Sequence, residues 1–148
     1  MIDYIFENLP EYGTLTQDSE GFVYIDIPND YVYKLFPMIG EKGFVEPPYF
    51  GPGQHGANIS VIYANEAKEN NIKIKEDGQT IYFSPKACEV VKPGKWKEVD
   101  QVYIITVDAP ALNKLRKRYG LRDAAYPFHI TIGIKYNVAE QEELLEAS

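Results

Sequence analysis

The sequence contains a single cysteine, Cys88, among 148 residues, which excludes an internal disulfide and any site built from several thiolates. It also lacks an apolar run long enough to cross a bilayer and a signal-peptide pattern, which favours a cytoplasmic protein. Cys88 itself is expected to be a small buried apolar residue. A chain of this length can bury a hydrophobic core without a disulfide or a structural zinc ion, so we expect one domain over residues 1–148.

Positive charge is also scarce, because 15 Lys and Arg stand against 22 Asp and Glu, for a net charge of −7. Proteins that grip long nucleic acids take most of their affinity from a basic face, so we expect no such partner. A small nucleotide in a local pocket remains compatible with this charge. The 12 Tyr and 7 Phe could stack on its bases, although most aromatic side chains serve as core and sheet residues.

The hydrophobic pattern predicts two halves with the same order of elements: a strand, a helix, and a strand with polar residues on one face. Strands are predicted over 21–27, 57–63, 101–107 and 128–136, with a further hairpin of 72–75 and 80–83 about Asp77-Gly78. Helices are predicted over 31–39, with a kink or early end at Pro37, and over 110–119, and a short polar helix or turn is predicted over 66–71. The acidic tail over 140–146 is expected to be a short helix or a frayed end.

The predicted helix over 110–119 carries four cations on the face that we expect to be exposed: Lys114, Arg116, Lys117 and Arg118. Cations near a helix C-terminus complement the negative end of the helix dipole. We therefore prefer a solvated helix surface to a nucleotide-binding patch.

Two short motifs place polar side chains on one face of a strand. Side chains alternate between the two faces of a strand, so His129 and Thr131 of the segment His129-Ile130-Thr131 point to the same side. An imidazole there can transfer a proton, while the neighbouring hydroxyl donates a hydrogen bond to a phosphate oxygen. Asn58 and Ser60 repeat the arrangement in the first half, so strands packed around one cleft would bring both pairs together.

The other histidine, His55, lies three residues before Asn58 in a glycine-rich linker. It could swing into the cleft as a substitute base. Glycines on either side favour a mobile, exposed loop, so we prefer a surface histidine without a role in the site.

These segments resemble the 2H phosphoesterase superfamily, whose signature is two His-x-Thr/Ser motifs on strands of two lobes. The similar segments are 56–62 (GANISVI), 76–78 (EDG), 115–121 (LRKRYGL) and 127–133 (PFHITIG), within residues 22–136. The branch they most resemble is the Swiss army knife RNA repair-like group, which includes phage anti-CBASS nucleases.

The resemblance implies a bilobed α+β fold, with two antiparallel sheets in pseudo-two-fold β-α-β halves around a central cleft. It also implies that His129 is an acid/base catalyst and that Ser60 and Thr131 bind the phosphate. The expected reaction is cleavage of a cyclic or 3′-5′ phosphodiester without a metal or an organic cofactor.

Asn58 departs from the family pattern, which has histidine at this position. An asparagine can hydrogen-bond to a phosphate but exchanges no proton near neutral pH, so one partner of the acid/base pair is missing. A positioned acid or base contributes roughly 10²- to 10⁴-fold, and the chain is therefore expected to be slow or inactive. Asn58 fits either a natural relative that only binds its ligand or a substitution that traps one, and we favour the second.

The expected ligand is a small nucleotide, either a cyclic dinucleotide or a 2′,3′-cyclic phosphate end. Four loop aromatics are candidates for stacking on its bases: Tyr49, Phe50, Trp96 and Tyr126. Trp96, which lies between two lysines, is the strongest of them.

Two alternative functions stay open. The cleft could serve a nucleotide sensor or sponge without turnover, or it could be vestigial in a protein-interaction module that uses the basic helix or the acidic tail.

Overall fold

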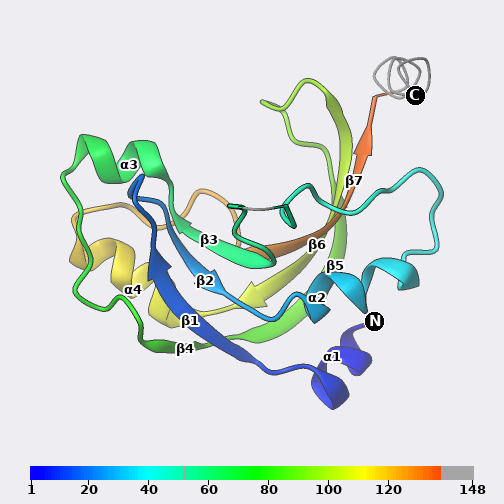
Figure 1. Ribbon diagram of the computed structural model, residues 1–148, viewed down its shortest axis with the longest axis horizontal. Helices are drawn as coiled ribbons and strands as arrows, with labels where there is room; N and C mark the ends of the chain where they lie inside the picture. Colours follow the sequence, from blue (N-terminus) through cyan, green and yellow to red (C-terminus); the bar gives the residue numbers. More distant parts are fainter. Residues whose placement is uncertain (52, 138–148) are drawn as a thin grey trace.

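The described residues, 1–51 and 53–137, form a curled antiparallel sheet with helices packed against it (Figure 1). In this computed structural model the strands are β1 (Tyr12–Gln17), β2 (Val23–Asp26), β3 (Asn58–Ile62), β4 (Thr80–Tyr82), β5 (Ser84–Val91), β6 (Val99–Asp108) and β7 (His129–Tyr136). The helices are α1 (Ile2–Asn8), α2 (Asp30–Tyr33), α3 (Ala64–Glu69) and α4 (Pro110–Arg118), with a 3₁₀ turn η1 (Phe36–Met38). The strand order is β4-β1-β2-β3-β7-β6-β5.

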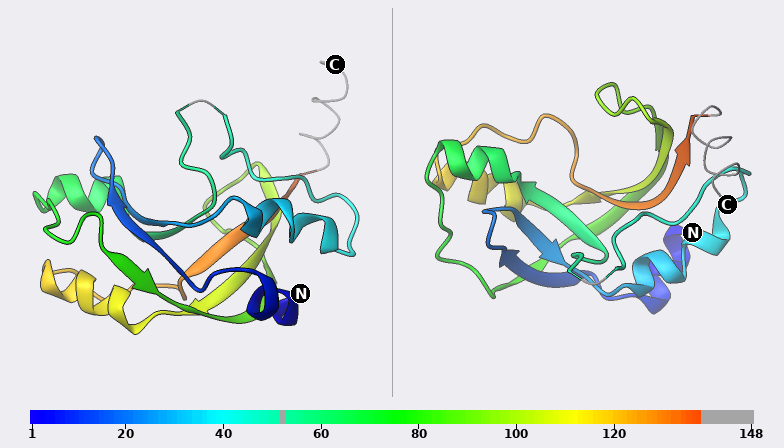
Figure 2. Two further views of the ribbon diagram at one scale, coloured as in Figure 1. Left: turned by 60° about the horizontal axis from the view of Figure 1, so that its bottom comes forward. Right: turned by 45° about the horizontal axis from the view of Figure 1, so that its top comes forward.

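The two expected sheets are continuous in the structure, because β3 of the first half pairs with β7 of the second. This junction is short, and its registered partners are Ile59 and Ile130. Figure 2 shows how strongly the joined sheet curls. The mixed α and β class with antiparallel strands agrees with the expected fold, whereas the pseudo-two-fold relation of the halves stays a prediction.

A row of four isoleucines runs across the middle of the sheet and fixes its register. Ile25, Ile59, Ile130 and Ile105 are successive partners on β2, β3, β7 and β6, and each is 0% exposed. Burying such a side chain contributes about 2 kcal/mol. A slip of one residue would move these four side chains to the other face and bring polar neighbours into the core, so the register is strongly specified.

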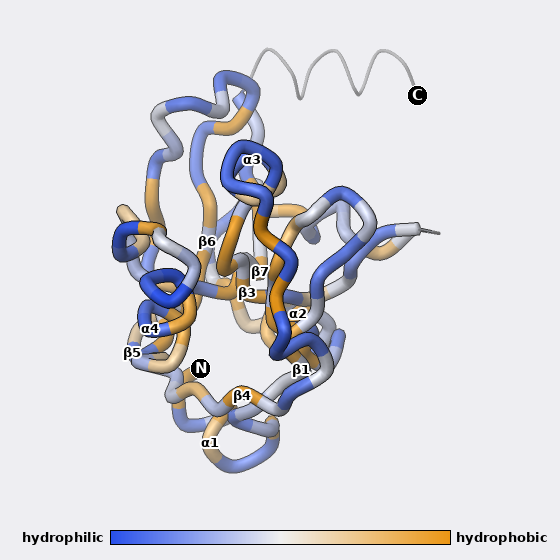
Figure 3. Tube along the Cα trace, turned by 90° about the vertical axis from the view of Figure 1, so that its left-hand side faces the viewer, coloured by the Kyte–Doolittle hydropathy of each residue, from blue (hydrophilic) through white to orange (hydrophobic). Residues whose placement is uncertain are grey.

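The helices cover the isoleucine row on the core side of the sheet. Leu112 and Leu115 of α4 and Ile5 of α1 belong to the same buried cluster as the four isoleucines. Figure 3 shows that the hydrophobic segments gather in the sheet, while α3 is hydrophilic. The opposite face of the central strands is therefore left for polar side chains.

Most of the predicted elements are present. Strands β2, β3, β6 and β7 and helix α4 confirm the segments predicted by alternation and by helical spacing. The helix predicted over 31–39 ends early and continues as the turn η1, where Pro37 occupies one of its first positions. Cys88 is half-buried instead of buried, because it lies on the edge strand β5. The tail predicted over 140–146 lies outside the described residues.

The predicted hairpin of 72–75 with 80–83 is wrong, because β4 pairs with β1 instead. Residues 72–75 form no strand, and their backbone is held by the side chain of Gln17. Its amide donates to the carbonyl of Ile72 and accepts from the N–H of Ile74, both at 2.9 Å. One side-chain amide thus satisfies the groups that a partner strand would otherwise pair.

Candidate active site

The pairing of β3 with β7 brings the two predicted polar pairs together. Around the Ile59–Ile130 partners, antiparallel geometry sets Asn58 opposite Thr131 and Ser60 opposite His129. Residues directly opposite each other point to the same face, here the face away from the isoleucine row. All four polar residues are partly exposed, as expected for the floor of an open site.

The neighbouring strands extend this polar face on both sides. On β2, Asp26 is the partner of Asn58 and Tyr24 is the partner of Ser60. On β6, Thr106 is the partner of His129. Burial raises the pKa of Asp26, although the nearby His55 ring opposes that shift. The polar face therefore spans four strands and carries a carboxyl group at one margin.

The orientation of His129 is fixed by the backbone just before its own strand. Its Nδ1 lies 2.9 Å from the carbonyl oxygen of Pro127. A carbonyl oxygen only accepts, so Nδ1 carries the hydrogen, and the neutral ring has its acceptor lone pair on Nε2. His129 is thus set to receive or deliver a proton through Nε2.

Asn58 is held by the turn that leads into β3. Its Nδ2 donates to the carbonyl of Gly56 at 2.8 Å, which leaves the side-chain oxygen to face a ligand. Gly56 has φ +71°, and a Cβ there would meet Oδ1 of Asn29 at 2.5 Å. That same Oδ1 accepts from the N–H of Ala57 at 3.0 Å. Only glycine fits this turn, and the turn sets where Asn58 enters the site.

His55 is half-buried and held by other side chains, where the sequence led us to expect an exposed loop residue. Its Nε2 lies 2.8 Å from Oδ2 of Asp18, and its side chain is 34% exposed. The ring also stands edge-on against Tyr24 and Phe22, with centroid separations of 4.7 and 5.3 Å. Because Tyr24 is the partner of Ser60, His55 lies over the margin of the polar face.

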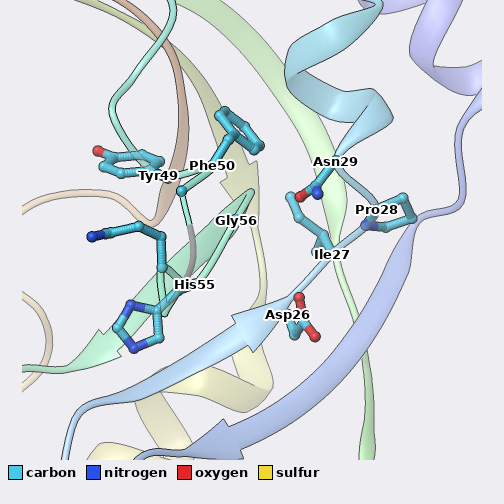
Figure 4. A pocket seen from close by; sticks show the side chains of 10 residues that line it. Asp26, Ile27, Pro28, Asn29, Tyr49, Phe50, His55 and Gly56 are labelled. Atoms are coloured by element: carbon cyan, nitrogen blue, oxygen red, sulfur yellow. The ribbon is translucent and has the colours of Figure 1, made fainter.

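A cavity of about 450 Å³ lies at the margin of the polar face, and Asp26 is the residue of that face that lines it. Figure 4 shows Tyr49, Phe50 and His55 of the long linker on one side, and Asp26 and Asn29 on the other. The cavity reaches the polar face through Asp26, which is the partner of Asn58. Its size suits one nucleotide unit.

The four loop aromatics divide into two groups. Tyr49 and Phe50 line the cavity, and the Tyr49 side chain is hydrogen-bonded to that of Thr131. Burial raises the pKa of Tyr49, and the hydrogen bond with Thr131 partly offsets that rise. Trp96 and Tyr126 are 38% and 78% exposed, and neither lines this cavity. Their predicted stacking role therefore has no support from the position of the cavity.

The sequence pattern did not reveal a second group of aromatic side chains, which lies at the margin of the site. Phe22 stacks on Tyr24 and on Tyr63, with centroid separations of 5.0 and 6.4 Å. The alternation of residues 21–27 predicted a strand, but it gave no sign of which face lies over the site. Tyr63 follows β3 directly and is 55% exposed, so this group can reach a ligand.

The basic helix differs from the expected solvated surface at one position. Arg116 is only 6% exposed, and it holds Glu66 of α3 through two nitrogen–oxygen contacts of 3.0 and 2.8 Å. It also donates to the carbonyl of Val61, at the end of β3. The hydrogen bonds with Arg116 lower the pKa of Glu66. Arg116 is therefore a structural tie between α4, α3 and β3.

Comparisons with known proteins agree with this geometry. A family model described as Swiss Army Knife, 2H phosphoesterase domain, matches residues 23–139. The searches of curated proteins and of solved structures found no match. Within residues 1–51 and 53–137, no helix is long and apolar enough to span a membrane, and no three His, Cys, Asp or Glu side chains gather as metal ligands would.

Proposed function

The chain belongs to the Swiss Army Knife family of 2H phosphoesterase domains, and from this we propose that it is a metal-independent phosphodiesterase of cyclic nucleotides. The observation that supports this most is the Ile59–Ile130 pairing, which sets both polar pairs on one face. The proposed substrates are cyclic dinucleotides or 2′,3′-cyclic phosphate ends. A cyclic dinucleotide substrate would give the protein an anti-CBASS role.

In the proposed reaction, the phosphate lies over β3 and β7. The hydroxyls of Ser60 and Thr131 donate to its non-bridging oxygens as negative charge builds there. A ribose 2′-hydroxyl or a water attacks phosphorus, a new O–P bond forms, and the bond to the leaving oxygen breaks. A base takes the proton of the attacking group, and the protonated Nε2 of His129 gives one to the leaving oxygen.

Asn58 limits this reaction because its amide exchanges no proton near neutral pH. Its oxygen can still accept a hydrogen bond from a ribose hydroxyl. Restoring histidine at this position is expected to raise the cleavage rate by roughly 10²- to 10⁴-fold.

The test incubates the chain and its Asn58→His variant, in EDTA, with 3′,3′-cyclic diadenylate and with 2′,3′-cyclic adenylate. Products are resolved by chromatography, and binding is measured by calorimetry. We expect Asn58→His to cleave one of these substrates and the unmodified chain to bind the same one. If neither protein binds or cleaves a cyclic nucleotide, the proposed function is wrong.

A sensor or sponge is the second candidate, and the amide at Asn58 is the observation that favours it. Such a protein would bind the nucleotide tightly and release it unchanged, whereas a slow enzyme would yield product on long incubation. The alternative of a protein-interaction module gains less support. Arg116 is buried, so only three of the four cations of α4 remain available to a protein partner.

A further inference from the structure

The residue that could replace the missing histidine lies three positions before Asn58. We propose that His55, oriented by Asp18, is the base that works with His129 in the turnover of this chain. This inference rests on the proposed phosphodiesterase function. It assigns a proton-transfer role to a residue outside the two paired motifs.

The position of His55 suits that role. Its ring packs edge-on against Tyr24, the partner of Ser60, with centroids 4.7 Å apart. Ser60 in turn lies opposite His129, so Tyr24, Ser60 and His129 form one row across three strands. Two inter-strand spacings, roughly 10 Å, separate the Tyr24 and His129 backbones. A phosphate over Ser60 would therefore lie between the two imidazoles, with one available on each side.

The orientation of His55 mirrors that of His129. The carboxylate of Asp18 only accepts when ionised, so the Nε2 of His55 carries the hydrogen and Nδ1 keeps the lone pair of the neutral ring. Asp18 is itself fixed, because its Oδ1 accepts from the backbone N–H groups of Glu20 and Phe22 at 2.9 and 3.0 Å. Each histidine thus has one nitrogen held by an oxygen and the other left for proton transfer.

Two carboxyl groups, Asp18 and Asp26, lie beside the His55 ring. Burial alone would raise the pKa of Asp18, but hydrogen bonds from His55 and from two backbone N–H groups lower it. Asp18 is therefore ionised at neutral pH, as a carboxylate must be to stabilise an imidazolium. Asp26 also lies close enough to interact with the ring electrostatically. Tyr24, whose pKa is raised by burial and then by these carboxylates, remains a neutral hydroxyl.

The proton balance closes with the two histidines alone. Nδ1 of His55 takes the proton of the attacking hydroxyl while its oxygen bonds to phosphorus. The bond from phosphorus to the leaving oxygen breaks, and the imidazolium of His129 protonates that oxygen from Nε2. Figure 4 shows His55 beside β2 at the wall of the cavity, where a nucleotide sugar could present its hydroxyl.

The first experiment measures single-turnover cleavage of the cyclic nucleotide that Asn58→His cleaves. The proteins are the unmodified chain, His55→Asn, Asp18→Asn and Asn58→His, with the exposed Gln79→Asn as a control. We expect slow cleavage by the unmodified chain and a loss of roughly 10²-fold or more in His55→Asn. The loss in Asp18→Asn should be smaller, because this variant removes orientation and charge but leaves the ring. Thermal unfolding should change little in either variant. Because His55 also lines the cavity, the rates are measured at saturating nucleotide, which separates a loss of proton transfer from a loss of binding.

Two results would overturn the inference while leaving the proposed function intact. One is cleavage by Asn58→His but none by the unmodified chain. The other is cleavage by His55→Asn at the unmodified rate. If Asn58→His is inactive as well, the proposed function fails first and the role of His55 fails with it.

A second measurement needs no variant. Nitrogen-15 chemical shifts of the imidazoles in the unmodified chain report which ring nitrogen carries the hydrogen. We expect His55 to be protonated at Nε2 and His129 at Nδ1 when neutral. A neutral His55 with its hydrogen on Nδ1 would leave no lone pair for the proposed step and would overturn the assignment.

Discussion

At the scale of single residues, the turn before β3 shows how the backbone positions a side chain in the site. Gly56 adopts φ +71° so that its carbonyl can accept from Asn58, and Asn29 occupies the space where a Cβ would stand. The Asn29 oxygen then accepts from the N–H of Ala57. These contacts connect β2, through the turn after it, to the first residue of β3.

Gly56→Ala should therefore destabilise the fold by about 1–3 kcal/mol, since it adds both backbone strain and a clash with Asn29. The measurement is urea unfolding followed by tryptophan fluorescence. Gly78→Ala is a matched control, because Gly78 also has positive φ, +92°, but a Cβ there meets nothing within 4 Å. Gly78→Ala should lower the free energy of unfolding by less than Gly56→Ala does. Equal losses of unfolding free energy in the two variants would show that the contact with Asn29 does not matter.

At the scale of elements, Arg116 shows why a pattern of charges can mislead. It lies among three other cations on α4, yet its guanidinium reaches Glu66 on α3 and the end of β3. A planar guanidinium with five donors can pair with a carboxylate through two nitrogens and still donate to backbone carbonyls, whereas a lysine has three donors on a single nitrogen. The tie fixes α4 and α3 against the strand that carries Asn58 and Ser60.

Arg116→Ala is expected to cost about 3–5 kcal/mol of unfolding free energy, because it removes the guanidinium that pairs with Glu66 and donates to the carbonyls of Val61 and Arg122. Lys117→Ala is the control on the same helix. Its ion pair with Asp123, at 3.3 Å, is largely exposed and should contribute less than about 1 kcal/mol. Chemical unfolding of the two variants measures the difference, and similar losses would contradict the structural role of Arg116.

The same tie predicts how stability depends on pH. The pKa of Glu66 lies below its ordinary value of 4.5 because of the Arg116 hydrogen bonds. A carboxyl group with a lowered pKa in the fold stabilises it at higher pH, and that contribution is lost as the pH falls through the folded pKa. Stability should therefore decline less steeply between about pH 6 and about pH 3 in Glu66→Gln than in the unmodified chain. Equal slopes in urea unfolding would contradict the assignment.

The elements that the sequence predicted are those with a clear period. Alternation marks β2, β3 and β7, and helical spacing marks α4. Strand β1 has a weaker signal, because Gly13 interrupts it and Leu15 is its one large buried side chain. That glycine is required by packing, since a Cβ there would lie 2.5 Å from the carbonyl oxygen of Asp26. Such close approaches depend on the partner strand and leave no local pattern.

The candidate site divides in the same way. The period of two predicted that Asn58 shares a face with Ser60, and His129 with Thr131. That the two pairs lie opposite each other depends on the junction of β3 with β7, which no local pattern encodes. The contact of His55 with Asp18 joins residues 37 positions apart, so a loop histidine between glycines gave no sign of it.

At the scale of the whole molecule, one sheet serves both halves of the site. The isoleucine row holds four strands in register on the core face, and the same register aligns the polar row on the other face. In the proposed reaction neither half holds a complete phosphate site, because each would supply one hydroxyl and one position for proton transfer. Function in this account depends on the short β3–β7 junction, and the two halves should act as a unit.

The measurement that tests this claim most directly compares cyclic-nucleotide cleavage rates of four proteins: the unmodified chain, Asn58→His, His129→Asn and the double variant. The account predicts that Asn58→His raises the rate by roughly 10²- to 10⁴-fold, and that the gain disappears when His129 is also replaced. A gain that persists without His129 would show that the two halves do not share one catalytic site, and no gain from histidine at position 58 would show that this position takes no part in proton transfer.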